Sequence, residues 1–181
     1  MKDKVDPQHE DAIHSVRIDG PRKVALEAGG KRYIQFAATK GANVTREVSV
    51  KVKLTNGGDE ALVRRGLLTA DKVRAYEADA LVDTGAVKSI LPVQVVQQLG
   101  LAIVGKTRAR YANDSGEDVD ITEMVGIEIN GRRTTEEALV LGSGVLIGQT
   151  VLESLDLLVD CVAHRLVPNP EHPDQPVINV R

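Results

Sequence analysis

The stretch Ala80-Leu81-Val82-Asp83-Thr84-Gly85-Ala86 joins an apolar run to a carboxylate and then to a turn. Hydrolysis of a peptide bond without a metal needs a base that activates water and an acid that polarises the carbonyl group. Two neighbouring carboxylates can supply both, because like charges so close together cannot both ionise easily and the pair then shares a proton. Asp83 is therefore the candidate for one carboxylate of such a pair.

Two further stretches accompany this motif: Ser89-Ile90-Leu91-Pro92 follows it closely, and Leu146-Ile147-Gly148 comes much later in the chain. The combination resembles the retroviral-type aspartic proteases (retropepsins, clan AA) and their small bacterial relatives. The resemblance covers roughly Glu47 to Pro168. It implies a barrel of the acid-protease type and makes Asp83 the catalytic residue of an aspartic endopeptidase.

The resemblance also implies a role for each neighbour of the candidate carboxylate. Thr84 would hydrogen-bond across the axis of a dimer, Gly85 would allow the tight turn, and Ala86 stands where a small residue follows the motif. Leu146-Ile147-Gly148 would be the strand that supports the catalytic loop from behind. Retroviral members often have Arg next, whereas this chain has Gln149. That departure concerns a structural ion pair and not the catalysis.

A flap, which is a hairpin that closes over bound peptide, is implied between Arg110 and Glu117. Its predicted residues are Tyr111, Ala112, Asn113, Asp114, Ser115 and Gly116. Closure would exclude water and add main-chain hydrogen bonds to an extended substrate. From the polar residues alone, an ordinary solvated hairpin turn is the alternative.

The sequence contains one Asp-Thr-Gly, whereas the mechanism needs two carboxylates. Asp156 and Asp160 lack the following Thr-Gly, and Asp160 fits the end of a strand. We therefore expect a symmetric homodimer in which Asp83 of each chain meets at the two-fold axis. The predicted partners are a second copy of the chain and a peptide or protein substrate, and no cofactor is implied.

Another class of function stays open: a protease-like fold that serves as a dimerisation or peptide-binding module without turnover. A metal site is not expected. His9 and His14 are five residues apart, so a helix would turn them to different faces. The acidic residues Asp114, Glu117, Asp118 and Asp120 lack the spacing of a calcium loop and fit strand ends better.

Composition limits the remaining classes. Of the 181 residues, 42% are apolar but only 2% are aromatic, so Val, Leu, Ile and Ala must build the core. The net charge of -3 and the absence of a Lys/Arg block argue against a nucleic-acid-binding face. No stretch reaches the roughly 18 apolar residues of a membrane span, so we expect no membrane partner and a cytoplasmic location.

Alternating apolar and polar residues predict mainly β structure. Asp59 is expected to cap a helix, Val93, Val96 and Leu99 to share the buried face of another helix that Gly100 ends, and Asn130-Gly131 to form a tight hairpin turn. The expected strands cover residues 23–27, 32–36, 48–54, 73–82, 106–111, 119–129, 137–141, 157–160 and 165–167, and the helices 59–67, 92–99 and 150–155. Such strands and short helices indicate a closed or partly closed β-barrel.

The predicted organisation is an N-terminal extension at residues 1–44, a protease domain at 45–170 and an irregular tail at 171–181. The extension contains a hairpin signal at Gly29-Gly30. It is expected to be a structural hairpin, with a pro-segment in the cleft and an added dimer contact as the alternatives.

Overall fold

The computed structural model describes residues 23–28, 31–36, 47–110 and 115–178 of the chain. The chain divides into two compact units, Met1–Thr45 and Arg46–Arg181. In the first unit, β1 (Lys23–Ala28) pairs antiparallel with β2 (Lys31–Phe36), and Ala25 lies opposite Ile34. The predicted pairing of these two strands is confirmed, and the function of residues 1–44 stays a prediction.

The second unit consists of short strands and short helices. In chain order its elements are β3 (Ser49–Asn56), α1 (Gly57–Arg64), a 3-10 turn (Ala70–Lys72), β4 (Ala75–Val82), β5 (Ile90–Leu91), α2 (Val93–Leu99), β6 (Ile103–Arg110), β7 (Gly116–Ile129), β8 (Arg132–Val140), β9 (Leu146–Ile147), α3 (Gln149–Ser154), β10 (Leu157–Asp160) and β11 (Arg165–Pro168). None of the helices in the described residues has the length and apolar character needed to cross a membrane.

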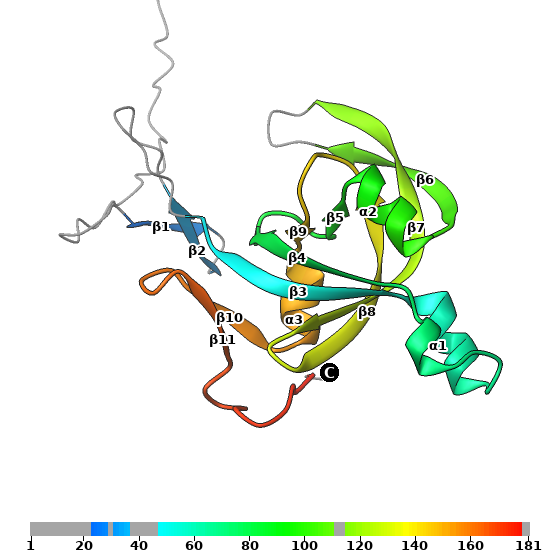
Figure 1. Ribbon diagram of the computed structural model, residues 1–181. Helices are drawn as coiled ribbons and strands as arrows, with labels where there is room; N and C mark the ends of the chain where they lie inside the picture. Colours follow the sequence, from blue (N-terminus) through cyan, green and yellow to red (C-terminus); the bar gives the residue numbers. More distant parts are fainter. Residues whose placement is uncertain (1–22, 29–30, 37–46, 111–114, 179–181) are drawn as a thin grey trace, which may run out of the picture. The chain divides into compact units, whose positions relative to one another are not determined.

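The main sheet bends into a partly closed ring. Its strand order is β3-β4-β9-β5-β8-β7-β6, and β3 also pairs with β7, so all of these strands except β6 form a closed circuit. β10 and β11 form a separate antiparallel pair. Figure 1 shows the ring, with α1 standing out from it where β3 ends. The prediction of a mainly β fold, with a closed or partly closed barrel and two or three short helices, is confirmed: the ring is partly closed and the described residues form three short α-helices.

The core is aliphatic, as the scarcity of aromatic residues predicts. Along β3, Val52 and Leu54 are buried while Lys51 and Lys53 face outward, which follows from the two-residue period of a strand. The same hydrophobic core also includes apolar residues from β5, α2, β7 and β9, and from α3 and the residue after it: Leu91, Val96, Leu99, Val125, Ile127, Ile129, Ile147, Val151 and Leu155. The two helices that flank the ring, α2 and α3, therefore pack on one continuous core.

Two turn predictions are confirmed. Asn130 and Gly131 have φ angles of 51° and 77° and join β7 to β8, with Ile129 opposite Arg132. Both central residues of such a two-residue hairpin turn need positive φ, which Asn and Gly adopt most readily. Gly100 ends α2 in the left-handed conformation, with a φ of 59°.

Two helix predictions are wrong in detail. Asn56, not Asp59, caps α1: its Oδ1 accepts a hydrogen bond from the Asp59 N–H at 2.9 Å. Asp59 instead receives paired hydrogen bonds from the Arg74 guanidinium at 2.7 Å each, a partner that is distant in sequence. In α2 the buried residues are Val95, Val96 and Leu99. Val93 is 48% exposed, because the turn of the helix puts it to one side of the face that Val95, Val96 and Leu99 share. Pro92 precedes the helix as its N-cap.

The segment from residue 169 to 178 has no helix or strand, but it is tied to the barrel. Arg132 is buried and donates hydrogen bonds to the carbonyl groups of Leu155, Asp156, His172 and Pro173 at 2.7 to 3.1 Å. A guanidinium fork can bind several carbonyl groups at once. The end of the described chain is thereby held against β8 and the loop after α3.

Candidate active site

Asp83 comes directly after β4, and neighbours on both sides hold the end of that strand. The Val82 N–H donates to the Val48 carbonyl at 2.8 Å, on the β3 side. On the β9 side, the Leu81 N–H donates to Val145 at 2.9 Å and the Asp83 N–H donates to Ile147 at 3.1 Å. A strand bonded along both edges has a fixed end. The backbone of Asp83 is therefore part of the sheet, although its side chain is in the following loop.

The carboxylate of Asp83 lies at the surface in a tight turn. The Gly85 N–H donates to its Oδ1 at 2.8 Å, and the Ala86 N–H donates to the Asp83 carbonyl at 3.3 Å. A β-carbon at position 85 would lie 3.1 Å from that same Oδ1, so Gly85 allows the close approach. The turn orients the carboxylate while leaving it exposed to solvent.

The stretch Leu146-Ile147-Gly148 lies against this turn. β4 and β9 pair in parallel, with Leu81 opposite Leu146 and Val82 opposite Ile147. The next residue of that stretch, Gly148, donates its N–H to Ser89 Oγ at 3.1 Å. The structure thus brings these residues together with the loop that carries Asp83, as expected, and their supporting role stays a prediction.

Ala86 and Thr84 have different surroundings. The Ala86 carbonyl accepts a hydrogen bond from the Gln149 N–H at 2.7 Å, which ties the loop to the start of α3. Thr84 is exposed and lines an open groove of about 630 Å³, together with Gln149 and residues of α3 and β10. Leu158, on the wall of this groove, is 46% exposed. An apolar surface therefore begins beside the candidate catalytic loop.

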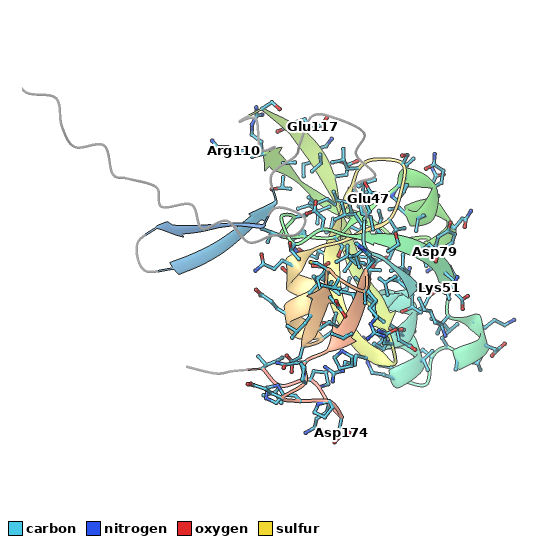
Figure 2. All side chains as sticks on the ribbon, turned by 90° about the vertical axis from the view of Figure 1, so that its left-hand side faces the viewer. Glu47, Lys51, Asp79, Arg110, Glu117 and Asp174 are labelled. Atoms are coloured by element: carbon cyan, nitrogen blue, oxygen red, sulfur yellow. The ribbon has the colours of Figure 1, made fainter. Side chains whose placement is uncertain are left out.

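The predicted flap falls on the hairpin of β6 and β7. The two arms pair antiparallel up to Arg110 opposite Gly116. Of the predicted flap residues, Ser115 is exposed and Gly116 starts β7, while Tyr111, Ala112, Asn113 and Asp114 lie outside the described residues. Figure 1 shows the arms above β5 and β9, and Figure 2 shows Arg110 and Glu117 near the ends of the arms, at the top of the view.

The acidic residues of these arms have cationic neighbours across the strand pair. Arg108 lies 3.3 Å from Asp118, and Lys106 lies 3.2 Å from Asp120. Opposite charges directly across a strand pair stabilise the hairpin modestly. Asp118 and Asp120 are two of the four acidic residues that the sequence analysis considered as calcium ligands, and both form ion pairs within the hairpin.

Asp156 and Asp160, the other carboxylates considered for a catalytic pair, accept hydrogen bonds from neighbouring residues. A side-chain hydrogen bond from Asn169 is the largest of the contacts that hold the pKa of Asp156 below its usual value, with His172 and the Val177 N–H adding to it. The backbone N–H of Ala163 has the leading role in lowering the pKa of Asp160. Both groups are therefore engaged in local structure and are poor candidates for a second catalytic carboxylate.

No role was predicted for Glu136, which is buried behind the loop. Its Oε1 accepts a hydrogen bond from the backbone N–H of Ser89 at 3.1 Å, and Ser89 itself is 0% exposed. The two-residue period of β8 puts Glu136 on the same face as the buried Ala138. That alternation is the signal that could have identified Glu136 as an inward-facing acid.

No family model and no curated protein matches the chain, whereas 240 chains of known structure match it. One is the retroviral protease-like domain of Ddi1 from Leishmania major, which is 16% identical, with a TM-score of 0.42, over 68% of this chain and 90% of that domain. Another is the EIAV protease complexed with the inhibitor HBY-793, which is 19% identical, with a TM-score of 0.39, over 62% of this chain and 91% of that protease. The bacterial type of the resemblance stays a prediction.

Proposed function

We propose that the chain is a homodimeric aspartic endopeptidase in which two copies of Asp83 share the reaction. The ionised Asp83 of one copy accepts a proton from the attacking water, and the protonated Asp83 of the other copy donates a hydrogen bond to the substrate carbonyl. The water oxygen then bonds to the carbonyl carbon, and the peptide C–N bond breaks as the amine takes up a proton. No cofactor takes part.

The observation that carries this proposal is the fixed, exposed carboxylate of Asp83. Its backbone N–H is bonded to Ile147 and its Oδ1 to the Gly85 N–H. A catalytic group needs this combination, because its orientation must be set before substrate arrives and it must remain accessible. Because the sequence has one Asp-Thr-Gly, the second carboxylate is assigned to a second copy of the chain.

Two further features support the proposal. Thr84 is exposed beside an open, partly apolar groove, which is a surface that a second copy could cover. The β6–β7 arms form a hairpin at the position expected for a flap. Extended peptides are the proposed substrates, because a closing hairpin can add main-chain hydrogen bonds to an extended chain.

The test is cleavage of a mixed library of extended peptides at several pH values by the wild type and by Asp83→Asn. Asp79→Asn is the matched control, since Asp79 lies on β4, the strand that leads to Asp83, and its exposed side chain contacts Lys51 at 3.3 Å. Figure 2 labels Asp79 and Lys51. Light scattering gives the mass of each variant. We expect a dimeric wild type and control that cleave, and a dimeric Asp83→Asn that does not.

A well-folded wild type that cleaves no peptide at any pH would overturn the proposal. If that protein still dimerises or binds extended peptides, and Asp83→Asn does so equally well, the chain is a binding or dimerisation module without turnover. Cleavage that survives in Asp83→Asn would also contradict the assignment of Asp83.

A further inference from the structure

Glu136 is a buried carboxyl group that the proposed reaction does not use. It lies on β8 and is 5% exposed. Its Oε1 accepts the Ser89 N–H at 3.1 Å, whereas its Oε2 has no hydrogen-bond partner among the described residues. A buried carboxyl group with an unpaired oxygen is costly to the fold. A role for the contact with Ser89 would explain why a carboxyl group is kept at this buried position.

Ser89 is bonded at three points. Its N–H donates to Glu136, its carbonyl accepts from the Leu139 N–H at 3.0 Å, and its Oγ accepts from the Gly148 N–H at 3.1 Å. Glu136 and Leu139 belong to β8, whereas Gly148 follows β9. Ser89 is accordingly the point at which β8, the loop after Asp83 and the supporting strand are joined.

Gly148 carries this connection to the catalytic carboxylate. Its two neighbours in sequence both bond to the loop: the Ile147 carbonyl accepts from the Asp83 N–H, and the Gln149 N–H donates to Ala86. A shift of Gly148 would therefore move both ends of the turn that orients Asp83. Because reaction rates depend steeply on the placement of reacting groups, small shifts at this point lower turnover.

We infer that Glu136 and Ser89 are positioning residues for Asp83, with Glu136 fixing the Ser89 backbone and Ser89 fixing Gly148. The inference rests on the proposed function, because it assigns them to the geometry of that same site. Both side chains are buried, so their replacement should act on turnover and not on substrate binding.

The test compares Glu136→Ala, Glu136→Gln and Ser89→Ala with two controls. Thr122→Ala removes another fully buried hydroxyl that accepts a backbone N–H, from Ala138 at 3.1 Å. Glu137→Gln changes the next carboxyl group on β8, which is half-exposed beside Lys88. The readouts are kcat and KM for a cleaved peptide, the stability of each variant, and amide hydrogen exchange at Asp83, Gly148 and Gln149.

We expect Glu136→Ala and Ser89→Ala to lower kcat about tenfold, the equivalent of one lost buried hydrogen bond, with little change in KM. Glu136→Gln should keep most of the activity, because its amide oxygen can accept the same Ser89 N–H. Thr122→Ala should lose stability without losing kcat, and Glu137→Gln should change neither. Exchange at Gly148 and Gln149 should quicken in Glu136→Ala and Ser89→Ala alone.

An unchanged kcat in Ser89→Ala and Glu136→Ala, or an equal loss in Thr122→Ala, would overturn the inference. If Glu136→Ala does not fold, Ser89→Ala carries the comparison, because it breaks the next bond in the same series. Failure of the proposed function is distinguishable: the wild type then cleaves nothing, while the exchange measurement still reports whether Glu136 and Ser89 hold the loop.

Discussion

Gly148 lies directly against the backbone of Lys88. A β-carbon at position 148 would be 2.6 Å from the Lys88 carbonyl carbon and 2.9 Å from the Val87 carbonyl oxygen. All of these are backbone atoms, which cannot move aside as the end of a flexible side chain could. The close approach lets the supporting strand contact the whole loop from Asp83 to Ser89.

Gly148→Ala should therefore destabilise the protein by about 1–3 kcal/mol, the usual cost of forcing extra atoms into a packed site. Urea unfolding measures the change. Gly144→Ala is the control, because a β-carbon there would meet nothing within 4 Å, and its stability should stay within about 0.5 kcal/mol of the wild type. Equal stability of the two variants would show that the loop and strand are not packed as described.

The ion pair of Asp59 and Arg74 should make stability depend on pH. Hydrogen bonds from the Arg74 side chain are the leading cause that lowers the pKa of Asp59 below its ordinary value. A carboxyl group with a lowered pKa in the folded state stabilises the fold above its unfolded pKa of about 3.9. That contribution is lost as the pH falls from there through the lower pKa of the folded state.

Asp59→Asn should consequently lower the free energy of unfolding by about 1–3 kcal/mol at neutral pH, because Asp59 is buried and its partner loses a charged acceptor. The difference from wild type should shrink as the pH falls below about 4, through the lowered pKa at which Asp59 of the folded wild type takes up a proton. Denaturant unfolding at a series of pH values measures it. A difference that stays constant down to acidic pH would contradict the predicted role.

Much of the fold could be predicted from local patterns. The alternation along β3, the turn at Asn130-Gly131 and the glycine that ends α2 are each set by neighbouring residues, and the structure confirms them. The cap of α1 could not be predicted in the same way. Asp59 is a good capping residue by propensity, but its pairing with Arg74 depends on the path of the chain through the 3-10 turn.

The candidate site shows the same division. The loop around Asp83 was predictable because its residues are consecutive, and the later Leu146-Ile147-Gly148 was linked to it through a family resemblance. The bond from Ser89 to Glu136 joins residues on different strands, and nothing in either segment alone indicates the other. Contacts between distant buried polar groups follow from the ring closure, which a local pattern does not encode.

Arg132 should control the segment from residue 169 to 178. Arg132→Met keeps an unbranched apolar stem but removes the donors to four carbonyl groups. We expect faster proteolysis and faster amide exchange in residues 169–178, with a stability loss of about 1–3 kcal/mol from the carbonyl groups left unpaired.

Arg165→Met is the matched control for that change. Arg165 is exposed, and its ion pair among the described residues is with Asp160, at 3.7 Å, at the end of the same β10–β11 hairpin. Its proteolysis should match the wild type. Equal protection of residues 169–178 in Arg132→Met and the wild type would mean that the guanidinium does not anchor the segment.

The most direct test of the shared carboxylates is subunit mixing. Wild type and Asp83→Asn are combined in equal amounts, left to exchange subunits, and assayed for peptide cleavage at constant total protein. If both carboxylates of a dimer are needed, mixed dimers are inactive and about a quarter of the wild-type activity remains. If each chain acts alone, about half of the activity remains, and that result would contradict the two-chain mechanism.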